Sequence, residues 1–322
     1  MKKLDETEII KKFQKKFGNR NFISEDVEFF SVGNTKIILK VDTLVASTDI
    51  PSRMSLKDAA RKSVVASVSD FAAKGVKPKF AIISVTLSSG ITSKKIDEIA
   101  SGFAKASKEF NIQILGGDIN EGKEISFSVC LFGIGEKIIT RKGAKTGDSI
   151  FVTGPFGYSA AGLEILLRNG KAVDSFSKKA IKSMITPQPR IDFALKNKKY
   201  FSSSMDSSDG LSTTLHEIAK QSKCKFVIQK IPAREDVKVY AQSHKKNFDD
   251  LILHGGEEYE IVFTVSQKDK SKIIKNAKLS KTPILEIGVV SKGRGVFVEK
   301  NKKFVTLEDR GWRHFTKTKK FN

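Results

Sequence analysis

Residues 55–88, SLKDAARKSVVASVSDFAAKGVKPKFAIISVTLS, contain a predicted helix followed at once by a predicted strand. The apolar residues of the first part recur at helical spacing on one face: Leu56, Ala60, Val64, Val68 and Phe71. Gly75 supplies a helix stop, and residues 78–88 are rich in the β-branched residues typical of a strand. Strands and helices alternate in both halves of the chain, so the sequence predicts an α/β or α+β fold with two layers per domain.

The chain has 322 residues, more than one typical domain, so we expect two. In the first half, we predict helices at 4–17, 55–75 and 93–110, strands at 26–30, 35–47, 78–88, 112–115 and 124–136, and a Gly-Gly-Asp turn at 116–118. In the second half, we predict helices at 158–170, 175–185, 211–222 and 267–277, and strands at 149–154, 200–206, 225–229, 259–266, 284–290 and 295–299. The basic, glycine-punctuated stretch 137–148 is the predicted junction, which gives domains 1–139 and 140–322.

The composition favours a globular protein: 39% of residues are hydrophobic and 29% are charged. No segment approaches the ~18 uninterrupted apolar residues of a membrane-spanning helix, and the basic first 17 residues lack the apolar core of a secretory signal. We therefore expect a cytoplasmic protein without a membrane partner. The net charge of +22 attracts anions, but the lysines are spread over the whole chain without a nucleic-acid-binding motif. A solvated lysine-rich surface is the favoured interpretation, and nucleic acid is not.

Carboxylates recur beside Gly, Ser or Thr at predicted strand ends and turns: Asp26, Asp42, Asp70, Asp118, Asp206, Asp209 and the pair Glu257–Glu258. Carboxylates at strand ends can converge on one crevice of an α/β sheet. Because no cysteine or histidine accompanies them at metal-ligand spacing, they suit a hard cation such as Mg²⁺, which typically bridges protein oxygens to phosphates. This pattern in a cationic chain predicts a site for a metal-complexed polyphosphate.

Each carboxylate taken alone has a structural alternative. Asp206 or Asp209 could cap the helix that starts near Leu211, and Asp118 could be a turn residue. Asp26 and Asp42 could be ordinary surface acids. Asp70 is harder to explain in this way, since a negative charge near the end of a helix opposes the helix dipole. The chain has no GxxxxGK[ST] loop and no GxSxG elbow, so these two kinds of active site are not predicted.

Several segments, in this order, resemble the thiamine-monophosphate kinase family: VDTLVAS, SVSDFAAKGVKP, ILGGDINEG, TRKGAKTGDSIFVTGPFGYSAAGLEIL, TPQPR, MDSSDGLSTTLHEIA and GGEEYEIVFTV. They span the chain from about residue 25 to its end. The family belongs to the superfamily of aminoimidazole ribonucleotide synthetase and selenophosphate synthetase. The resemblance implies a synthetase-like fold, with an N-terminal mixed sheet that pairs across a homodimer and a C-terminal α/β sandwich.

The resemblance also implies an activity, the phosphorylation of thiamine monophosphate to thiamine diphosphate by ATP with several Mg²⁺ ions. One alternative is another ATP-dependent kinase or synthetase of the superfamily. The other is a catalytically silent, basic nucleic-acid-binding protein on the same scaffold.

By position, the implied metal ligands are Asp26, Asp42, Asp70, Asp118, Asp206 and Asp209, of which all but Asp26 would be catalytic. The implied ATP contacts are Gly117, Asp118, Arg141 and Ser208, and the implied contacts to the thiamine end are Glu257 and Trp312. The chain departs from the family pattern at four places, of which the mildest is Glu258 in the position of an aspartate after Gly-Gly-Glu. Lys40 and Val41 replace a hydroxyl pair before Asp42, Asp49 replaces a substrate-binding histidine, and Ser24-Glu25-Asp26 replaces Gly-Asp-Asp. We expect Arg53 to take over the anion contact near Asp49.

Overall fold

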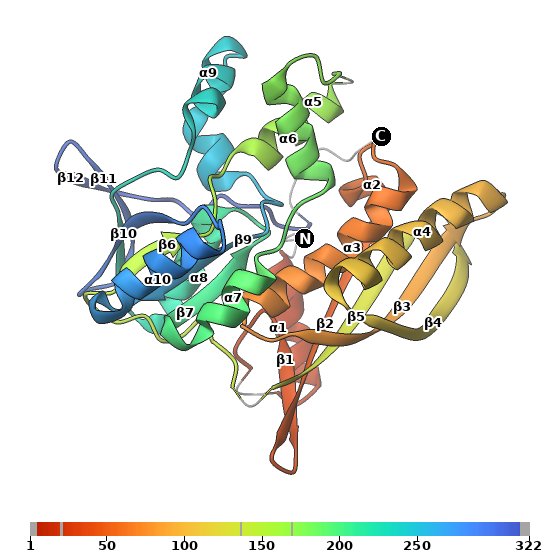
Figure 1. Cartoon of the computed structure of the whole chain (residues 1–322), viewed down its shortest axis with the longest axis horizontal. Coiled ribbons are helices and arrows are strands. Elements are labelled where there is room, and N and C mark those ends of the chain that lie inside the picture. Colours follow the sequence, from red (N-terminus) through yellow and green to blue (C-terminus); the bar gives the residue numbers. More distant parts are fainter. Residues whose placement is uncertain (1–4, 20–21, 136, 169, 316–322) are drawn as a thin grey trace.

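The computed structural model describes residues 5–19, 22–135, 137–168 and 170–315, which build two β-sheets with helices packed on them (Figure 1). The first sheet has five strands: β1 (Glu28–Val32), β2 (Thr35–Val45), β3 (Pro78–Ser88), β4 (Gln113–Gly122) and β5 (Ser126–Gly135). Their order is β1-β2-β5-β3-β4, and all neighbours are antiparallel except β3 and β4. The sheet is mixed, as the family resemblance implied.

Helices cover one face of this sheet. Helix α3 (Leu56–Ala73) and helix α4 (Ser93–Phe110) lie across the strands in Figure 1, and α2 (Ala46–Asp49) is a single turn after β2. Helix α3 begins after Ser55, whose side chain accepts the N–H of Asp58, and Gly75 follows it with φ +64°. The apolar core lies between α3, α4 and the sheet, while Val41 and Ile82 on the opposite face are exposed. The predicted helix–strand unit is therefore present and organises the first half.

The predicted turn at 116–118 is wrong, because β4 continues through the two glycines to Gly122. The strand remains paired with β3, and the register shifts once between Ala81 and Ile82. At Gly117 a Cβ atom would lie 1.7 Å from the carbonyl oxygen of Ile83, so only glycine lets the two backbones approach this closely. The glycines thus permit close strand pairing here and do not end the strand.

The second sheet has seven strands in the order β12-β11-β8-β10-β6-β9-β7. They are β6 (Ser149–Val152), β7 (Phe201–Ser207), β8 (Lys225–Ile228), β9 (Glu260–Val265), β10 (Leu285–Ser291), β11 (Gly295–Lys300) and β12 (Lys303–Thr306). Only β8 and β11 pair in parallel. The helices of this half are α5 (Tyr158–Leu167), α6 (Ser175–Ile185), α7 (Ile191–Asn197), α8 (Leu211–Ser222), α9 (Glu235–Ser243) and α10 (Gln267–Leu279).

Both faces of the second sheet are buried. Ile150 and Val152 of β6 belong to a core with α8 and α5, whereas Phe151 between them packs with residues of α7 and α10. The second core also contains Ala72 and Ala73 from the end of α3, so the two halves of the chain share buried apolar surface. Helix α7, helix α9 and strand β12 are elements that the sequence did not predict, and all three are short.

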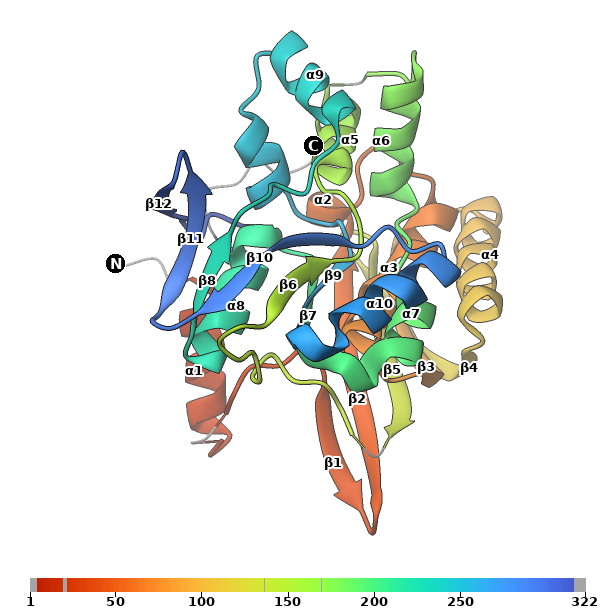
Figure 2. The same cartoon turned by 60° about the vertical axis from the view of Figure 1, so that its left-hand side comes forward.

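The N-terminal helix α1 (Glu6–Lys16) lies below β8 and α8 in Figure 2, and its first residue contacts the C-terminal segment. The backbone N–H of His314 donates to the carboxylate of Glu6 across this contact. The β1–β2 hairpin projects from the body of the molecule in both views. In the described part of the chain, none of the helices is both long and apolar enough to traverse a bilayer.

Candidate active site

One face of helix α3 carries polar residues that are buried at the centre of the molecule. Ser67 and Asp70 lie in the helix, and Lys74 is the residue directly after its end. Because they are spaced by three and four residues, the three side chains lie on the same face. All three are buried. Because charged side chains are rarely buried without partners, this face needs neighbours that satisfy it.

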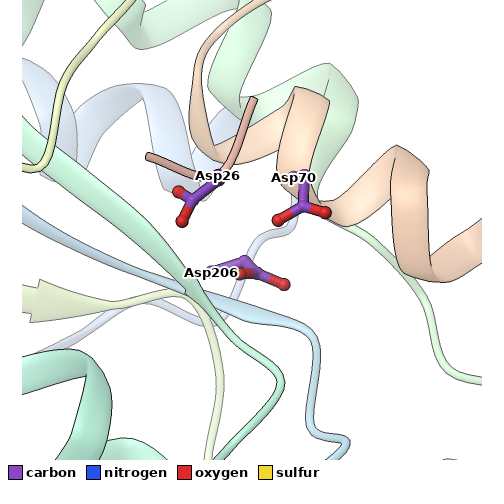
Figure 3. A group of neighbouring side chains, drawn as sticks. All are labelled: Asp26, Asp70 and Asp206. Atoms are coloured by element: carbon purple, nitrogen blue, oxygen red, sulfur yellow. The ribbon is translucent and has the colours of Figure 1, made fainter. Parts of the chain in front are cut away.

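Asp70 is joined by two aspartates from distant parts of the chain, Asp26 before β1 and Asp206 on β7 (Figure 3). One carboxylate oxygen from each of the three lies within 4.8 Å of the others. Their exposed fractions are 1% for Asp26, 6% for Asp70 and 2% for Asp206. The structure therefore brings three of the six predicted metal ligands into one buried cluster.

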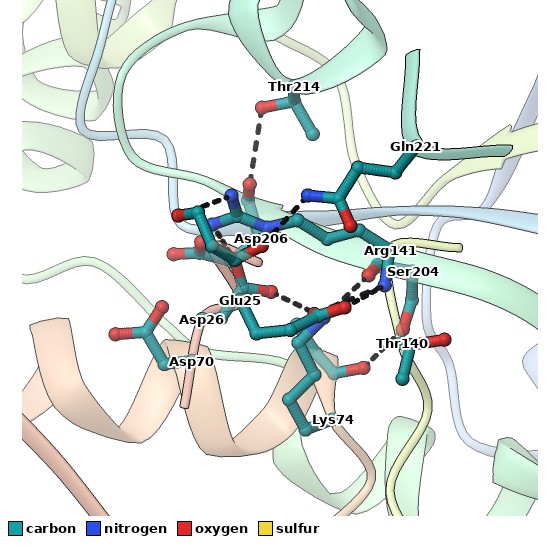
Figure 4. A network of polar contacts seen from close by, with 12 residues as sticks. Glu25, Asp26, Asp70, Lys74, Thr140, Arg141, Ser204, Asp206, Thr214 and Gln221 are labelled. Carbon is teal, nitrogen blue, oxygen red and sulfur yellow. Dashed lines mark hydrogen bonds and ion pairs between the residues drawn. The ribbon is translucent and has the colours of Figure 1, made fainter. Parts of the chain in front are cut away.

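Two cationic side chains hold Asp26 (Figure 4). The Nζ atom of Lys74 lies 2.9 Å from Asp26 Oδ2, and Arg141 donates from Nε to Asp26 Oδ1 at 2.8 Å. Lys74 also donates to Glu25 at 2.7 Å and to the Ser204 carbonyl at 2.9 Å. Burial disfavours the charged form of Asp26, but the attraction of Lys74 and Arg141 outweighs burial and lowers the pKa of this carboxyl.

Asp70 and Asp206 are less well compensated. Burial, with the nearby charge of Asp26, raises the pKa of Asp206 to about 7, although the Ser69 hydroxyl donates to it at 2.9 Å. Burial also raises the pKa of Asp70 well above its usual value despite the attraction of Lys40. Like charges held close together in a dry site favour a bound cation. Because every donor in the cluster is a carboxylate oxygen, these residues fit Mg²⁺.

Asp42 is tied to the cluster through its own neighbours on β2 and α3. Its Oδ2 accepts from the Ser67 hydroxyl at 2.8 Å, and its Oδ1 lies 3.2 Å from Lys40 Nζ. The same ammonium lies 2.9 Å from Asp70 Oδ2. Burial opposes the charge of Lys40, but the attraction of Asp70 and Asp42 prevails and raises its pKa well above the usual value.

The loop after β7 connects the carboxylate cluster to two further segments. The carbonyl of Ser208 accepts the N–H of Glu257 at 2.6 Å, and the carbonyl of Asp209 accepts the N–H of Trp312 at 2.8 Å. Burial, reinforced by the charge of Glu6, raises the pKa of Asp209 to about 6. Backbone hydrogen bonds thus place Ser208, Asp209, Glu257 and Trp312 in one region.

Glu257 lies in a strained loop. Glu257 and Tyr259 have φ of +63° and +53°, a region that non-glycine residues rarely adopt. Lys62 of α3, fully buried, forms an ion pair with Glu257. Burial raises the pKa of Glu257, Lys62 opposes the shift, and the charge of Asp49 adds to it. Strain of this kind clusters at ligand-binding sites.

Asp49 and Arg53 have protein partners in the structure. Asp49 Oδ2 accepts from the Val45 N–H at 2.7 Å and from the Thr48 hydroxyl at 2.9 Å, contacts that hold the short helix α2. Arg53 is exposed and donates to the carbonyl of Gly170 at 3.1 Å, which links the region of α2 to the loop after α5. The electrostatic influence of Asp49 on Glu257 connects Asp49, but not Arg53, to the site.

Gly117 and Asp118 are not brought to the cluster within one chain. In the sheet, Asp42 is paired with Val129, Val129 with Ile83, and Ile83 with Gly117. Gly117 is therefore three strand spacings, or about 14 Å, away from Asp42. Asp118 belongs to the next row, and successive residues of a strand face opposite sides of the sheet. Its exposed side chain accepts from Asn120 at 2.6 Å on the face that α3 and α4 leave uncovered.

The sequence analysis missed several residues of the site. Lys74, Lys62, Ser67 and Ser69 contact predicted site residues but were not singled out. Their signal was present, because Lys62 with Ser69 and Ser67 with Lys74 recur at seven-residue spacing, about two helical turns, in a helix otherwise suited to burial. Glu258 was noted only as a mild departure. Its carboxylate accepts the N–H groups of Gly157 and Ser159 at the start of α5, and burial raises its pKa to about 8.

Comparison with known proteins agrees with this architecture. The family model described as "AIR synthase related protein, N-terminal domain" matches residues 24–136, which contain the whole five-stranded sheet. The fold is that of a synthetase-like protein of this class. A thiamine-monophosphate kinase of Nitrosopumilus maritimus is 59% identical over 98% of this chain and 100% of its own length. The chain belongs to the thiamine-monophosphate kinase family.

More distant relatives agree over similar lengths. A thiamine-monophosphate kinase of Aquifex aeolicus is 32% identical over 91% of this chain and 92% of its own. The solved structure of AaThiL complexed with AMPPCP and TMP has a TM-score of 0.87 and 31% identity, covering 98% of both chains. The similarity therefore extends over both sheets.

Proposed function

We propose that this protein transfers the γ-phosphoryl group of ATP to thiamine monophosphate and so makes thiamine diphosphate. The observation that carries this proposal is the buried cluster of Asp26, Asp70 and Asp206. It occurs in a chain that matches thiamine-monophosphate kinases over nearly its full length. The similar structure that binds AMPPCP, an analogue of ATP, together with TMP supports both substrates.

The reaction asks little covalent chemistry of the protein. The acceptor is a phosphate monoester with a second pKa near ~6, so it is largely dianionic at neutral pH and needs no general base. The difficulty is to bring two polyanions together in line, which is achieved by positioning and by opposite charge. A site rich in carboxylates and cations, without an activated nucleophile, suits this reaction.

We assign metal binding to Asp26, Asp42, Asp70, Asp206 and Asp209, with Asp118 as a further ligand. When bound, Mg²⁺ would supply positive charge that offsets the negative charge of these carboxylates and of the phosphate groups. Lys74 holds Asp26, and the Ser67 and Ser69 hydroxyls orient Asp42 and Asp206 by donating to one oxygen of each. Each hydroxyl leaves the second oxygen of its aspartate available to a cation.

We assign ATP contacts to Gly117, Asp118, Arg141 and Ser208. The guanidinium of Arg141 lies at the edge of the carboxylate cluster, where its planar fork can contact phosphate oxygens while it retains Asp26. Asp49, Arg53, Glu257 and Trp312 would bind thiamine monophosphate. Trp312 offers an indole face to the cationic thiazolium ring, and Arg53 offers a charge to the phosphate.

We further propose a homodimer formed through the uncovered face of the five-stranded sheet. That face carries a continuous apolar group from β2, β3 and β5: Ile37, Leu39, Val41, Phe80, Ile82, Cys130, Phe132 and Ile134. Val41 is 61% exposed and Ile82 43% exposed, and apolar patches of this kind mark interfaces. Asp118 lies on the same face, so its role as a ligand depends on this assembly.

The oligomeric state can be measured by sedimentation velocity. Wild-type protein should sediment as a dimer and Ile82→Glu as a monomer, because a charge would be buried in the interface. Phe304→Glu is a matched control, since Phe304 is 55% exposed on β12 and lies outside the patch. A monomeric wild type would contradict the assembly.

We propose that the chain is divided into two domains, 1–139 and 140–322, whose junction lies in the irregular segment 137–148. Since the enzyme consumes ATP, we expect it in the cytoplasm, where ATP is made available. The basic surface is interpreted as solvated, without nucleic acid as a main partner.

One assay tests the function. Purified protein with ATP and Mg²⁺ is incubated with thiamine monophosphate or with free thiamine, and the products are separated by chromatography. Thiamine diphosphate should form from the monophosphate alone, since free thiamine lacks the dianionic acceptor. Absence of product from both substrates would overturn the proposal.

A further inference from the structure

Lys40 occupies an unusual position inside the candidate metal site. It precedes Asp42 by two residues on β2, so both side chains leave the strand on the same face. Its ammonium lies between two carboxylates, 3.2 Å from Asp42 and 2.9 Å from Asp70. The lysine therefore joins β2 to α3 at the point where two assigned metal ligands meet.

The charges in contact around this point are unequal. Within the described contacts, five carboxylates face three cationic side chains: Glu25, Asp26, Asp42, Asp70 and Asp206 against Lys40, Lys74 and Arg141. When all five carboxylates are ionised, as a bound cation favours, the excess of two negative charges equals the charge of one divalent ion. Without Lys40 the excess would be three, and Asp42 and Asp70 would lack this shared counter-charge.

We propose that the Lys40 ammonium acts as a built-in cation that takes the place of a metal ion between Asp42 and Asp70. The protein then binds fewer divalent ions at this site, or binds them less tightly, than a site with a neutral residue at position 40. This inference rests on the metal site of the proposed function, and it assigns Lys40 as a positioning residue for that site.

The geometry supports substitution of an ion and not a mere surface ion pair. The side chains of Lys40 and Asp70 are 23% and 9% exposed. Asp42 directs its other oxygen to Ser67, so its Oδ1 atom remains for a cation. A lysine ammonium and a hard metal ion both satisfy carboxylate oxygens by charge, and either can offset the cost of burying them.

The test counts bound ions without substrate, using Mn²⁺, which shares the preference for carboxylate ligands and is detected by electron paramagnetic resonance. Wild-type protein, Lys40→Ser and Lys40→Met are titrated with Mn²⁺, and free Mn²⁺ is measured. Lys36→Ser is the matched control, because Lys36 lies on the same strand with its ammonium 5.0 Å from the Phe29 ring centre. Thermal melts with and without Mg²⁺ accompany the titrations.

We expect Lys40→Ser to bind one additional Mn²⁺ per chain, or to bind Mn²⁺ at least about tenfold more tightly, and Lys36→Ser to match wild type. Lys40→Met should also bind more Mn²⁺, or bind it more tightly, than wild type, but by a smaller factor than Lys40→Ser. The methionine frees the carboxylates without adding an oxygen ligand. Mg²⁺ should raise the melting temperature of Lys40→Ser more than that of wild type. Unchanged or weaker Mn²⁺ binding would overturn the inference.

Failure of Lys40→Ser to fold even at saturating Mg²⁺ would also overturn the inference, because a metal ion should then replace the lysine. These readouts need neither ATP nor thiamine monophosphate. A wild type that lacks kinase activity would therefore contradict the proposed function and leave the Mn²⁺ comparison decisive for Lys40.

Discussion

Replacing Asp206 by asparagine should make the metal-free protein more stable and the enzyme inactive. Asp206 lies within 4.8 Å of carboxylate oxygens of Asp26 and Asp70. At that distance and an effective dielectric constant of about 20, each pair of charges repels by about 3 kcal/mol. The substitution weakens the hydrogen bond from Ser69, a loss of about 1–2 kcal/mol. Partial compensation by neighbouring cations reduces the gain further, so we expect a net stabilisation on the order of 2 kcal/mol at pH 8.

With Mg²⁺ present, the wild type should become more stable than Asp206→Asn. A ligand present at about 100 times its dissociation constant stabilises the folded state by about 2.7 kcal/mol, and the variant has lost one of the carboxylates assigned to the ion. Wild-type protein should therefore gain more unfolding free energy from Mg²⁺ than Asp206→Asn. Turnover by the variant should be abolished while its fold is retained.

Urea unfolding in EDTA and in Mg²⁺, followed by circular dichroism and by the fluorescence of the single tryptophan, Trp312, measures both effects. Asp192→Asn is the control, since Asp192 is an exposed aspartate in the first turn of α7. If Asp206→Asn is less stable than wild type in EDTA and gains equally from Mg²⁺, Asp206 supports the fold and the metal assignment is wrong.

Three further changes test other parts of the site. Glu258→Gln should remove a pH dependence of stability, because folding raises the pKa of Glu258 to about 8 from its ordinary value of 4.5 and the folded state therefore holds a proton that the unfolded state releases. The unfolding free energy of the wild type should fall relative to that of the variant between pH 5 and 8, by up to about 1.4 kcal/mol per pH unit. Urea unfolding across that range measures the difference. Arg53→Ala should raise the KM for thiamine monophosphate about tenfold in steady-state assays, and Arg53→Lys should raise it less. An unchanged KM in Arg53→Ala would rule out the phosphate contact. Lys74→Met should lower the unfolding free energy, measured by denaturant titration, by about 3–5 kcal/mol, because it leaves Asp26 and Glu25 buried with fewer partners. A loss below about 1 kcal/mol would show that other groups satisfy these carboxylates.

Local pattern was sufficient for most of the helices and strands. Helix α8 spans 211–222 and helix α4 spans 93–110, both as predicted, because their apolar spacing and flanking residues act within a few positions along the chain. The pattern failed at Gly116 and Gly117, where glycine was taken as a turn signal. Pairing with β3 decides the conformation there, and that partner is about thirty residues away.

The aspartates of the candidate site were also recognisable, because their neighbours Gly, Ser and Thr mark places where a backbone approaches a ligand. The resemblance to a kinase family added the order of the segments and the expected substrates. Both signals led us to expect that these aspartates converge on one site, but neither indicated which of them meet within a single chain.

The sequence by itself determined most of the helices and strands, the family and the set of candidate carboxylates, since these depend on residue type and short-range spacing. The tertiary structure decided that Asp26, Asp70 and Asp206 share one buried cluster, that Asp118 lies on another face of the sheet, and that Lys40 lies between two carboxylates. The physical reason is that distances between remote segments follow from how the sheets pack on α3. Charges act over those distances and not along the chain.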